Sequence, residues 1–327
     1  MSDEATIPLE NGEETTRCQY CGQRNKTHTK KSQAKCGRCL LPLNGKPHKK
    51  FAELSKHDYV HPSDSRALAA LRLIPGIDTA LKKLLEVVGE AQLRVVLMAS
   101  AVKVTPKQMP DLFAKLQVAC TTLGVDLPEL YLQQSPVVNA FTYGSEKPVV
   151  VLHTSLLERL NDEEVLAVIA HEVGHIHAQH SLYLTAAILF EAIANAAITS
   201  TPLAGLVKQI ISMTMRGALL SWMRCAELSC DRAALLVTQD PNIIGRTMMK
   251  LSGGALHGKL DYDEFLAQAR EFQKNYDDKA LDRFWADILN AGRTHPFPIW
   301  RVSEILKWVE SGEYQKLMDT EPQAMAA

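Results

Sequence analysis

The fold of this chain is decided by the stretch HEVGH, residues 171–175, and by the residues that lead into it. Asn161 is a favourable helix N-cap, and Glu164 stands three residues later, where the partner in a capping box belongs. Apolar residues then recur at helical spacing, so the sequence predicts a helix that runs through the stretch. On that helix His171 and His175 lie one turn apart and project from the same face.

Two imidazoles on one helical face can bind a single metal ion, and an adjacent glutamate can transfer a proton. Glu172 follows His171 directly, and His175 completes the H-E-x-x-H arrangement of zinc metalloproteases. The alternative is a chance match, which ordinary His and Glu frequencies allow about 1 to 2 times in 100 chains of this length. The acidic, well-capped helix around the motif favours the catalytic interpretation.

The composition is that of an ordinary globular protein, with 327 residues, 46% hydrophobic and 22% charged residues, and a net charge of −1. This balance gives no general reason to expect nucleic acid or an anionic membrane as a partner. The first residues are acidic and polar, unlike the basic and apolar regions of a signal peptide. We therefore expect a cytoplasmic location.

Two C-x-x-C pairs lie near the start of the chain, separated by fourteen residues. Four thiolates at this spacing bind zinc tetrahedrally in a small ribbon and leave no position for a substrate water, so we expect a structural zinc site. A redox or disulfide pair is the alternative. Basic residues are dense between residues 17 and 50, and we interpret them as a solvated face rather than a nucleic-acid patch. The ribbon ligands would be Cys18, Cys21, Cys36 and Cys39.

Helical patterns occupy much of the remaining chain, and two short strands precede the HEVGH helix. The strands, residues 137–142 and 149–152, are joined by a turn that contains glycine, and an extended stretch at 128–132 comes before them. A small sheet beside a metal-bearing helix gives an extended peptide an edge on which to add as a strand. Helices are expected at about 64–73, 78–88, 111–123, 241–251, 261–274 and 301–311.

The residues that follow the motif become strongly apolar. We expect the helix to continue past His177 and His180, whose side chains would turn away from the metal-binding face and lie at the surface. Between residues 181 and 207 the only charge is Glu191. A membrane span is one interpretation. The charged Glu191 and the threonine, asparagine and proline content of this run favour a buried or membrane-facing helical hairpin. Membrane association of the protein is therefore left open.

A second amphipathic helix carries Glu227 and Asp231 four residues apart, hence on one face. Two acids at this spacing are usually a solvated face, but a two-histidine zinc site also needs a third ligand. Glu227 is the standard completion of such a site, and Asp231 is then well placed to accept a ring N–H from a zinc-bound histidine. Cys225 and Cys230 are the alternative ligands.

These motifs together resemble the zinc endopeptidases of the HtpX and CAAX prenyl protease type, a gluzincin family. The resemblance covers about residues 66–312. It rests on the H-E-x-x-H motif, the E-x-x-x-D pair, and a late His295-Pro296 followed by Arg301. The triplet at residues 139–141 also matches the family's Asn-Ala-Phe element, whereas the ribbon is an addition to the family pattern.

The resemblance implies a zincin-type α+β domain, mostly helical, with a small sheet beside the metal-bearing helix. The polar, acidic composition of the start of the chain predicts a disordered tail (1–16), the cysteine spacing predicts the ribbon (17–41), and the proline and glycine content predicts a linker (42–65). The resemblance gives the metallopeptidase domain (66–312), which leaves a C-terminal tail (313–327).

The resemblance also implies a role for each site residue. Zinc would be bound by His171, His175 and Glu227, with Glu172 as the base, His295 stabilising the oxyanion, Asp231 and Arg301 behind the ligands, and Asn139, Ala140 and Phe141 contacting substrate.

The sequence as a whole therefore predicts a zinc metalloendopeptidase that acts on protein or peptide substrates and contains one catalytic and one structural zinc ion. Two alternatives belong to other classes: a zinc-binding scaffold without catalysis, and an adaptor led by the ribbon. The intact Glu172 argues against the first alternative, and the near-neutral net charge argues against the second.

Overall fold

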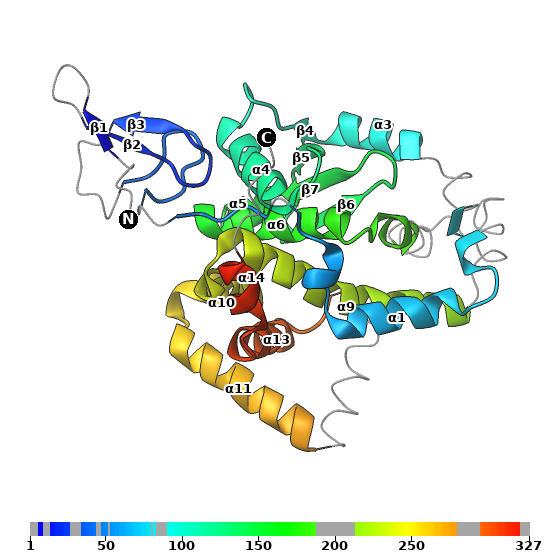
Figure 1. Cartoon of the computed structure of the whole chain (residues 1–327). Coiled ribbons are helices and arrows are strands. Elements are labelled where there is room, and N and C mark those ends of the chain that lie inside the picture. The colour runs from blue at the N-terminus through cyan, green and yellow to red at the C-terminus, as the bar shows by residue number, and fades with distance from the viewer. Residues whose placement is uncertain are drawn as a thin grey trace.

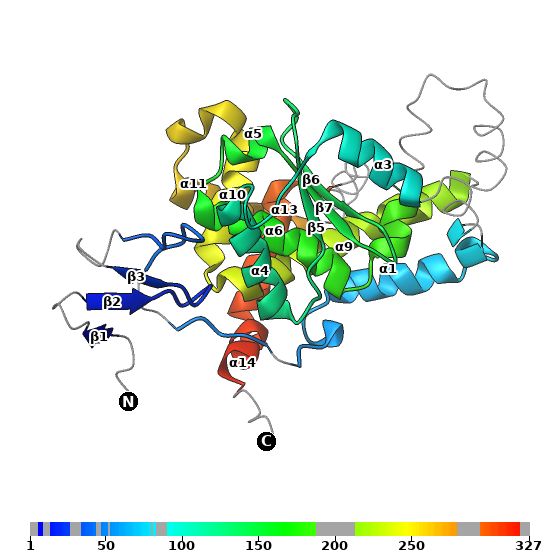
Figure 2. The ribbon, with the colours of Figure 1, turned by 90° about the horizontal axis from the view of Figure 1, so that it is seen from above.

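Two layers of helices and a small sheet surround the HEVGH helix in this computed structural model (Figure 1). The mixed four-stranded sheet covers one side of that helix, and the long helix α9 covers the other. Figure 2 shows the same elements from above, with a second, smaller sheet at one end of the molecule. The structure describes residues 6–8, 14–26, 34–43, 47–51, 53–79, 81–82, 90–187, 213–279 and 295–320.

The four-stranded sheet has the order β4-β5-β7-β6, with β5 and β7 parallel and the other neighbours antiparallel. Alternate residues of β7 face opposite sides: Val149 and Val151 pack with α3, whereas Val150 and Leu152 join the core with α4 and α6. Burial on both faces explains why β7 is a continuous apolar run. The strands are β4 (Val102–Lys103), β5 (Glu129–Gln133), β6 (Ala140–Tyr143) and β7 (Val149–His153).

Helix α6 (Asp162–His177) carries the HEVGH motif and begins as the sequence predicts. Asn161 Oδ1 accepts hydrogen bonds from the backbone N–H groups of Glu163 (3.1 Å) and Glu164 (3.0 Å). The Glu164 carboxylate accepts the Asn161 N–H in return at 2.8 Å, which completes the capping box. The expected start of this helix is confirmed.

The end of α6 differs from the sequence prediction, because the helix stops at His177 instead of continuing past His180. Gln179 adopts a left-handed conformation with φ of 62°. The N–H of His180 then donates to the carbonyl oxygen of His175 at 3.0 Å, and the N–H of Gln179 donates to the carbonyl oxygen of Ile176 at 3.0 Å. These two hydrogen bonds form a Schellman motif at the end of the helix. This turn brings His180 back towards the motif, where it is only 2% exposed, so its predicted surface position is wrong.

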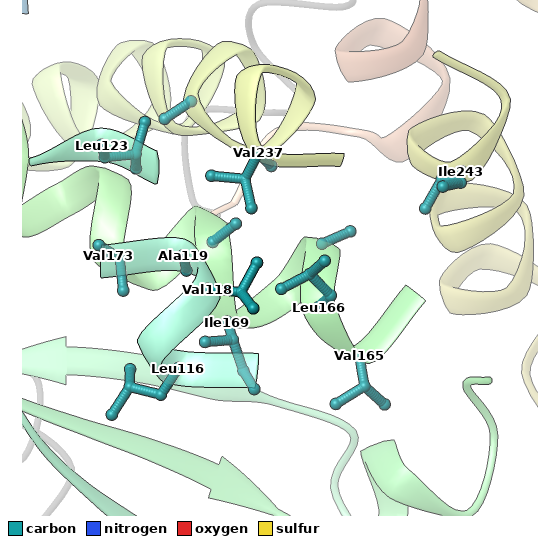
Figure 3. Packing of buried hydrophobic residues seen from close by; sticks show 14 of the residues in the cluster. Leu116, Val118, Ala119, Leu123, Val165, Leu166, Ile169, Val173, Val237 and Ile243 are labelled. Carbon is teal, nitrogen blue, oxygen red and sulfur yellow. The ribbon is translucent and has the colours of Figure 1, made fainter. Parts of the chain in front are cut away.

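Helices α6 and α9 (Met213–Thr238) pack closely where Gly174 faces α9. A Cβ atom on Gly174 would lie 2.8 Å from the Cβ of Ala233 and 3.3 Å from the Cα of Cys230. Helix α4 (Pro110–Leu123) covers another side of α6, and the apolar side chains of these three helices interlock (Figure 3). Glycine is therefore required at this position of the motif by packing, although it is a poor helix former.

The remaining helices pack around α9 and its neighbours. Helix α1 lies along α9, and α13 packs against α10 and α11. Most expected helices are confirmed, and the one expected at 78–88 lies largely outside the described residues. The helices are α1 (Pro62–Arg72), α3 (Glu90–Ser100), α5 (Thr154–Leu157), α10 (Pro241–Gly253), α11 (Tyr262–Asp278), α13 (Pro298–Glu310) and α14 (Glu313–Asp319), with 3₁₀ turns η2 (Lys56–Asp58) and η3 (Gly254–Lys259).

The smaller sheet consists of β1 (Thr6–Pro8), β2 (Glu14–Arg17) and β3 (Arg24–Lys26), all antiparallel. Part of this sheet lies within residues 1–16, for which the composition predicted disorder. Strand pairing supplies backbone partners there that composition does not reveal.

An ion pair connects the cysteine-rich segment to the helical body. Lys35 Nζ lies 2.7 Å from Asp162 Oδ2, at the first turn of α6. The buried Lys115 of α4 approaches the other oxygen of Asp162 at 3.0 Å. Burial acts to raise the pKa of Asp162, but the two lysines hold it below its usual value.

Residues on both sides of the expected metallopeptidase domain also pack against it. His48 Nε2 lies 2.7 Å from the carbonyl oxygen of Val237, and Tyr59 is only 1% exposed, although both belong to the expected linker. In the expected C-terminal tail, α14 places Tyr314 against Trp308. The domain boundaries drawn from the sequence stay predictions.

Within the described ranges, no helix has both the length and the apolar composition needed to cross a membrane. Residues 188–207, the greater part of the apolar run, lie outside the described residues.

Replacing Gly174 tests the close contact of α6 and α9. Gly174→Ala should force the helices apart, and overpacking of this kind lowers the free energy of unfolding by about 1–3 kcal/mol. Denaturant unfolding measures the loss. The matched control is Gly217→Ala, also in a helix, where an added Cβ meets nothing within 4 Å. That change should be neutral or should stabilise by about 0.5–1 kcal/mol. Equal midpoints for Gly174→Ala and the native protein would contradict the packing argument.

Candidate metal centre

The side chains of His171, His175 and Glu227 meet between α6 and α9. The Nε2 atoms of His171 and His175 each lie 3.3 Å from an oxygen of the Glu227 carboxylate. Zinc bonded at 2.0–2.1 Å in a tetrahedral site separates its ligand atoms by about 3.3 Å. All three residues are buried, with Glu227 only 2% exposed. Their spacing and chemistry therefore fit a zinc ion.

Asp231 and Arg301 lie behind His171. His171 Nδ1 is 3.1 Å from Asp231 Oδ1, which lets the carboxylate accept the ring N–H and leave Nε2 with its lone pair. Arg301, from α13, donates to both oxygens of Asp231 at 2.7 and 2.5 Å. Such a two-point contact fixes the carboxylate in plane and orientation. Both residues thus lie next to His171, and the roles predicted for them from the sequence stay predictions.

The charges of this centre favour a bound cation. Burial acts to lower the pKa of His171, but the charge of Glu227 and hydrogen bonds to Asp231 and Glu227 raise it to about 10. Burial acts to raise the pKa of Glu227, yet the nearby His295 and His171 hold it well below its usual value. The negative charge of the buried carboxylates favours protonated imidazoles, and a divalent metal ion can replace these protons and neutralise the same charge.

Glu172 lies beside the three candidate ligands but is held by a different element. Thr142, on β6, has its hydroxyl 2.7 Å from Glu172 Oε2 and 3.2 Å from the Glu172 carbonyl oxygen. Both residues are buried. Thr142 was not predicted from the sequence, although strand alternation places it on the same face of β6 as the predicted residue Ala140.

His295 reaches the centre from the segment before α13. Its Nδ1 lies 2.7 Å from Glu227 Oε2, and its side chain is 46% exposed. The charge of Glu227 raises the pKa of His295, with burial acting in the opposite direction. His295 therefore contacts a candidate ligand and also faces the solvent side of the site.

His180 and Asp64 lie behind His175, and neither role was predicted from the sequence. His180 Nδ1 is 3.2 Å from His175 Nδ1, and His180 Nε2 is 3.0 Å from Asp64 Oδ2. Asp64 belongs to the first turn of α1, about a hundred residues before the motif. No sequence spacing links α1 to α6, so only the folded chain could reveal Asp64.

A cavity of about 350 Å³ opens beside the centre. Asn139 and Ala140 contribute to its wall together with Glu172, whereas Phe141 does not. Phe141 sits on the opposite face of β6, where its ring stacks with Tyr143 at 6.3 Å between centroids. The structure thus brings two of the three expected substrate residues to the site. Apolar side chains also line the cavity: Leu156, Ala167, Val168, Ala234, Ile244, Met248 and Leu251.

The alternative sulfur ligands are placed differently from each other. His171, His175 and Cys230 each offer an atom within 4.8 Å of the others, so Cys230 lies near the centre. Its Sγ is also 3.8 Å from His180 Nδ1. Cys225 is not a member of any candidate metal-binding group among the described residues.

The four cysteines of the N-terminal segment form a second cluster. The Sγ atoms of Cys18 and Cys39 are 3.7 Å apart, and those of Cys21 and Cys36 are 3.6 Å apart. A disulfide requires about 2.05 Å, whereas sulfurs around a tetrahedral zinc ion lie about 3.8 Å apart. The cluster is therefore consistent with a zinc ribbon and not with disulfide pairs.

Comparison with known families agrees with this geometry. The model of peptidase family M48 matches residues 106–309, which include both helices of the centre. The chain belongs to peptidase family M48. As an M48 peptidase it is a zinc metalloendopeptidase, and the resemblance inferred from its motifs is confirmed.

Several curated proteins are similar to this M48 peptidase. "Plastoglobule-localized metallopeptidase 48, chloroplastic" of Arabidopsis thaliana is 38% identical over 272 residues, which are 82% of this chain and 77% of that protein. "Protease HtpX homolog" of Moorella thermoacetica is 26% identical, covering 49% of this chain and 61% of the relative. "Protease HtpX homolog 2" of Methanosarcina mazei is 27% identical, with 46% and 58% covered. No solved structure matches the chain.

Proposed function

We propose that this M48 peptidase cleaves peptide bonds with a zinc ion bound by His171, His175 and Glu227, and with Glu172 as the general base. The observation that carries the proposal is the position of the Glu227 carboxylate, 3.3 Å from the Nε2 atoms of both histidines. Zinc held there would act as a Lewis acid and lower the pKa of water to about 7.

The position of Glu172 and its contact with Thr142 support its proposed role as the general base. The Thr142 hydroxyl, 2.7 Å from Oε2, restricts the carboxylate and keeps it from joining the ligand cluster. Glu172 takes the proton of the attacking water and later transfers it to the leaving amine. Because Thr142 of β6 holds the Glu172 carboxylate next to the proposed zinc ligands, Glu172 can accept and donate a proton without binding the metal itself.

His295 would stabilise charge on the substrate carbonyl oxygen. Its Nδ1 is occupied by Glu227 at 2.7 Å, so Nε2 is the nitrogen available to the substrate. A hydrogen-bond donor aimed at the developing oxyanion contributes to catalysis in many acyl-transfer enzymes. The half-exposed position of His295 gives the substrate access to it.

The substrate would bind as an extended chain along β6. This strand is at the end of the sheet order, so one side of its backbone can pair with a peptide. Asn139 and Ala140 adjoin the cavity at the start of the strand. A peptide added there would pass Glu172 and the metal centre, which places its scissile bond at the site.

The second zinc ion would be structural and bound by the four-cysteine cluster. Backbone and side-chain donors approach the sulfur of Cys36, with Arg38 N at 3.4 Å and Asn25 Nδ2 at 3.7 Å. Such contacts stabilise thiolate charge. A site of four thiolates leaves no coordination position for water, so this ion takes no part in hydrolysis.

Variants of the two glutamates separate base from ligand. Glu172→Gln should retain zinc while peptide hydrolysis falls by about 10²–10⁴-fold, because only proton transfer is removed. Glu227→Ala should lose the zinc of this centre and its activity together, because a ligand is removed. Metal content by atomic emission and a peptide cleavage assay measure these two effects.

An active Glu172→Gln enzyme would exclude Glu172 as the base. If Glu227→Ala still bound zinc and cleaved peptide, another ligand, with Cys230 next in line, would be required. A native enzyme that binds zinc but cleaves nothing would favour the scaffold alternative.

The zinc count tests the second ion. The native protein should contain two zinc ions per chain, and the Cys36→Ser/Cys39→Ser variant should contain one and keep the catalytic centre. The matched variant His171→Ala/His175→Ala should also contain one, held by the cysteines. Atomic emission on the folded proteins measures each count. A native protein with one zinc ion, or a cysteine variant that keeps two, would contradict the ribbon assignment.

The cavity predicts a preference for a large apolar side chain next to the scissile bond. Val168 is half buried in its wall, and Val168→Phe should fill part of the 350 Å³. Removing such a binding pocket costs about 10–200-fold in kcat/KM. Peptides with Leu or Phe next to the cleaved bond should lose that much, and matched peptides with Ala there should change little. Equal losses for both peptide sets would show that the cavity does not select the substrate.

A further inference from the structure

His180 and Asp64 continue the hydrogen-bond network behind His175 into the protein interior. The Nδ1 atoms of His175 and His180 are 3.2 Å apart, and His180 Nε2 is 3.0 Å from Asp64 Oδ2. The exposed fractions of these three residues are 3%, 2% and 1%. Water is therefore excluded from the chain of contacts, and each polar atom in it depends on the others.

Asp64 is the fixed end of this chain. It accepts hydrogen bonds from the Trp222 indole N–H at 2.9 Å and from the Ser229 hydroxyl at 2.6 Å. Both partners belong to α9, whereas Asp64 belongs to α1. Three donors, including His180, converge on one buried carboxylate, which keeps it ionised and immobile.

The carboxylate determines where the protons lie. An ionised Asp64 can only accept, so His180 donates to it from Nε2 and presents a lone pair at Nδ1. His175 then donates from Nδ1 to this lone pair at 3.2 Å, since two facing lone pairs would form no hydrogen bond. This leaves the lone pair of His175 at Nε2, the atom that faces Glu227.

We propose that His180 and Asp64 are positioning residues that hold His175 in the tautomer and ring orientation that bind zinc. This inference rests on the proposed role of His175 as a ligand. It gives the two histidines different support at Nδ1, because Nδ1 of His171 contacts the Asp231 carboxylate directly, whereas Nδ1 of His175 reaches the Asp64 carboxylate through the imidazole of His180.

A pair of isosteric variants isolates the hydrogen bond between the two imidazoles. Asn has nearly the shape of Leu, but its amide oxygen can accept the N–H of His175 where Nδ1 of His180 now lies. His180→Leu should weaken zinc binding by about 10–100-fold, the usual effect of losing a partner of a ligating histidine. His180→Asn should restore most of that affinity. Asp64→Asn, one contact further away, should have a smaller effect than His180→Leu.

His177 supplies the matched control. It lies at the same end of α6, is half buried, and contacts Tyr59 and Leu54 but no residue of the centre. His177→Leu should therefore leave zinc affinity unchanged, even where it lowers stability. Affinity is measured by competition with a chelator on the full chain. Release of the zinc ion bound by the ribbon gives a separate step in the chelator titration, and this step is the one that is missing in the Cys36→Ser/Cys39→Ser variant. Circular dichroism and denaturant unfolding confirm that each variant is folded.

Two results would overturn the inference. One is native zinc affinity in His180→Leu while His175→Ala loses the ion. The other is equal weakening in His180→Leu, His180→Asn and His177→Leu, which would indicate a general structural role. The proposed ligand set has its own test, because retention of the ion by His175→Ala would exclude His175 as a ligand, whatever the His180 variants do.

Discussion

The close approach of α6 and α9 at Gly174 is the constraint on which the rest of the structure depends. Each helix presents polar residues at helical spacing, and the carboxylate of Glu227 spans both histidines only because no Cβ separates the helices there. One additional methyl group at residue 174 would meet Ala233 at 2.8 Å. The candidate metal centre thus depends on the close approach of two helix backbones, and the same contact buries its candidate ligands.

Burial of so many polar groups is costly unless each has a partner. The centre meets this requirement by drawing on elements far apart in the sequence. Arg301 of α13 supports Asp231 from one side, and Asp64 of α1 supports His180 from the other. Segments from the beginning and the end of the catalytic region therefore meet at the candidate zinc ligands. A change in the position of α1 or α13 would therefore alter the contacts of the candidate ligands.

The cysteine-rich segment contacts the same helix at its opposite end. Asp162 in the first turn of α6 pairs with Lys35 of that segment and with the buried Lys115 of α4. Negative charge at a helix N-terminus is favourable by itself, and the two lysines hold this carboxylate ionised. The ribbon is thus joined to the first turn of the helix that carries HEVGH, although it contributes no residue to the centre.

Local patterns in the sequence are sufficient to predict much of this protein. The capping box at Asn161, the shared face of His171 and His175, and the pairing of Glu227 with Asp231 all follow from helical periodicity within a few residues. The apolar run of β7 and the spacing of the cysteines are likewise local. The mostly helical α+β class, the family and the ribbon all follow from these features, because each depends on residues close together in the chain.

The tertiary structure decided which distant residues meet at the site, because the periodicity of a single helix or strand does not contain this information. The left-handed Gln179 ends α6 early and turns His180 inward, and a non-glycine residue gives little warning of such a turn. Asp64 and Thr142 reach the site from a distant helix and from a strand, so their roles depend on packing. Strand alternation separates Phe141 from Ala140, but only the packing of β6 makes Ala140 face the cavity and turns Phe141 away from it. Sequence periodicity determined which residues share a face, and only the packing of elements determined what each face meets.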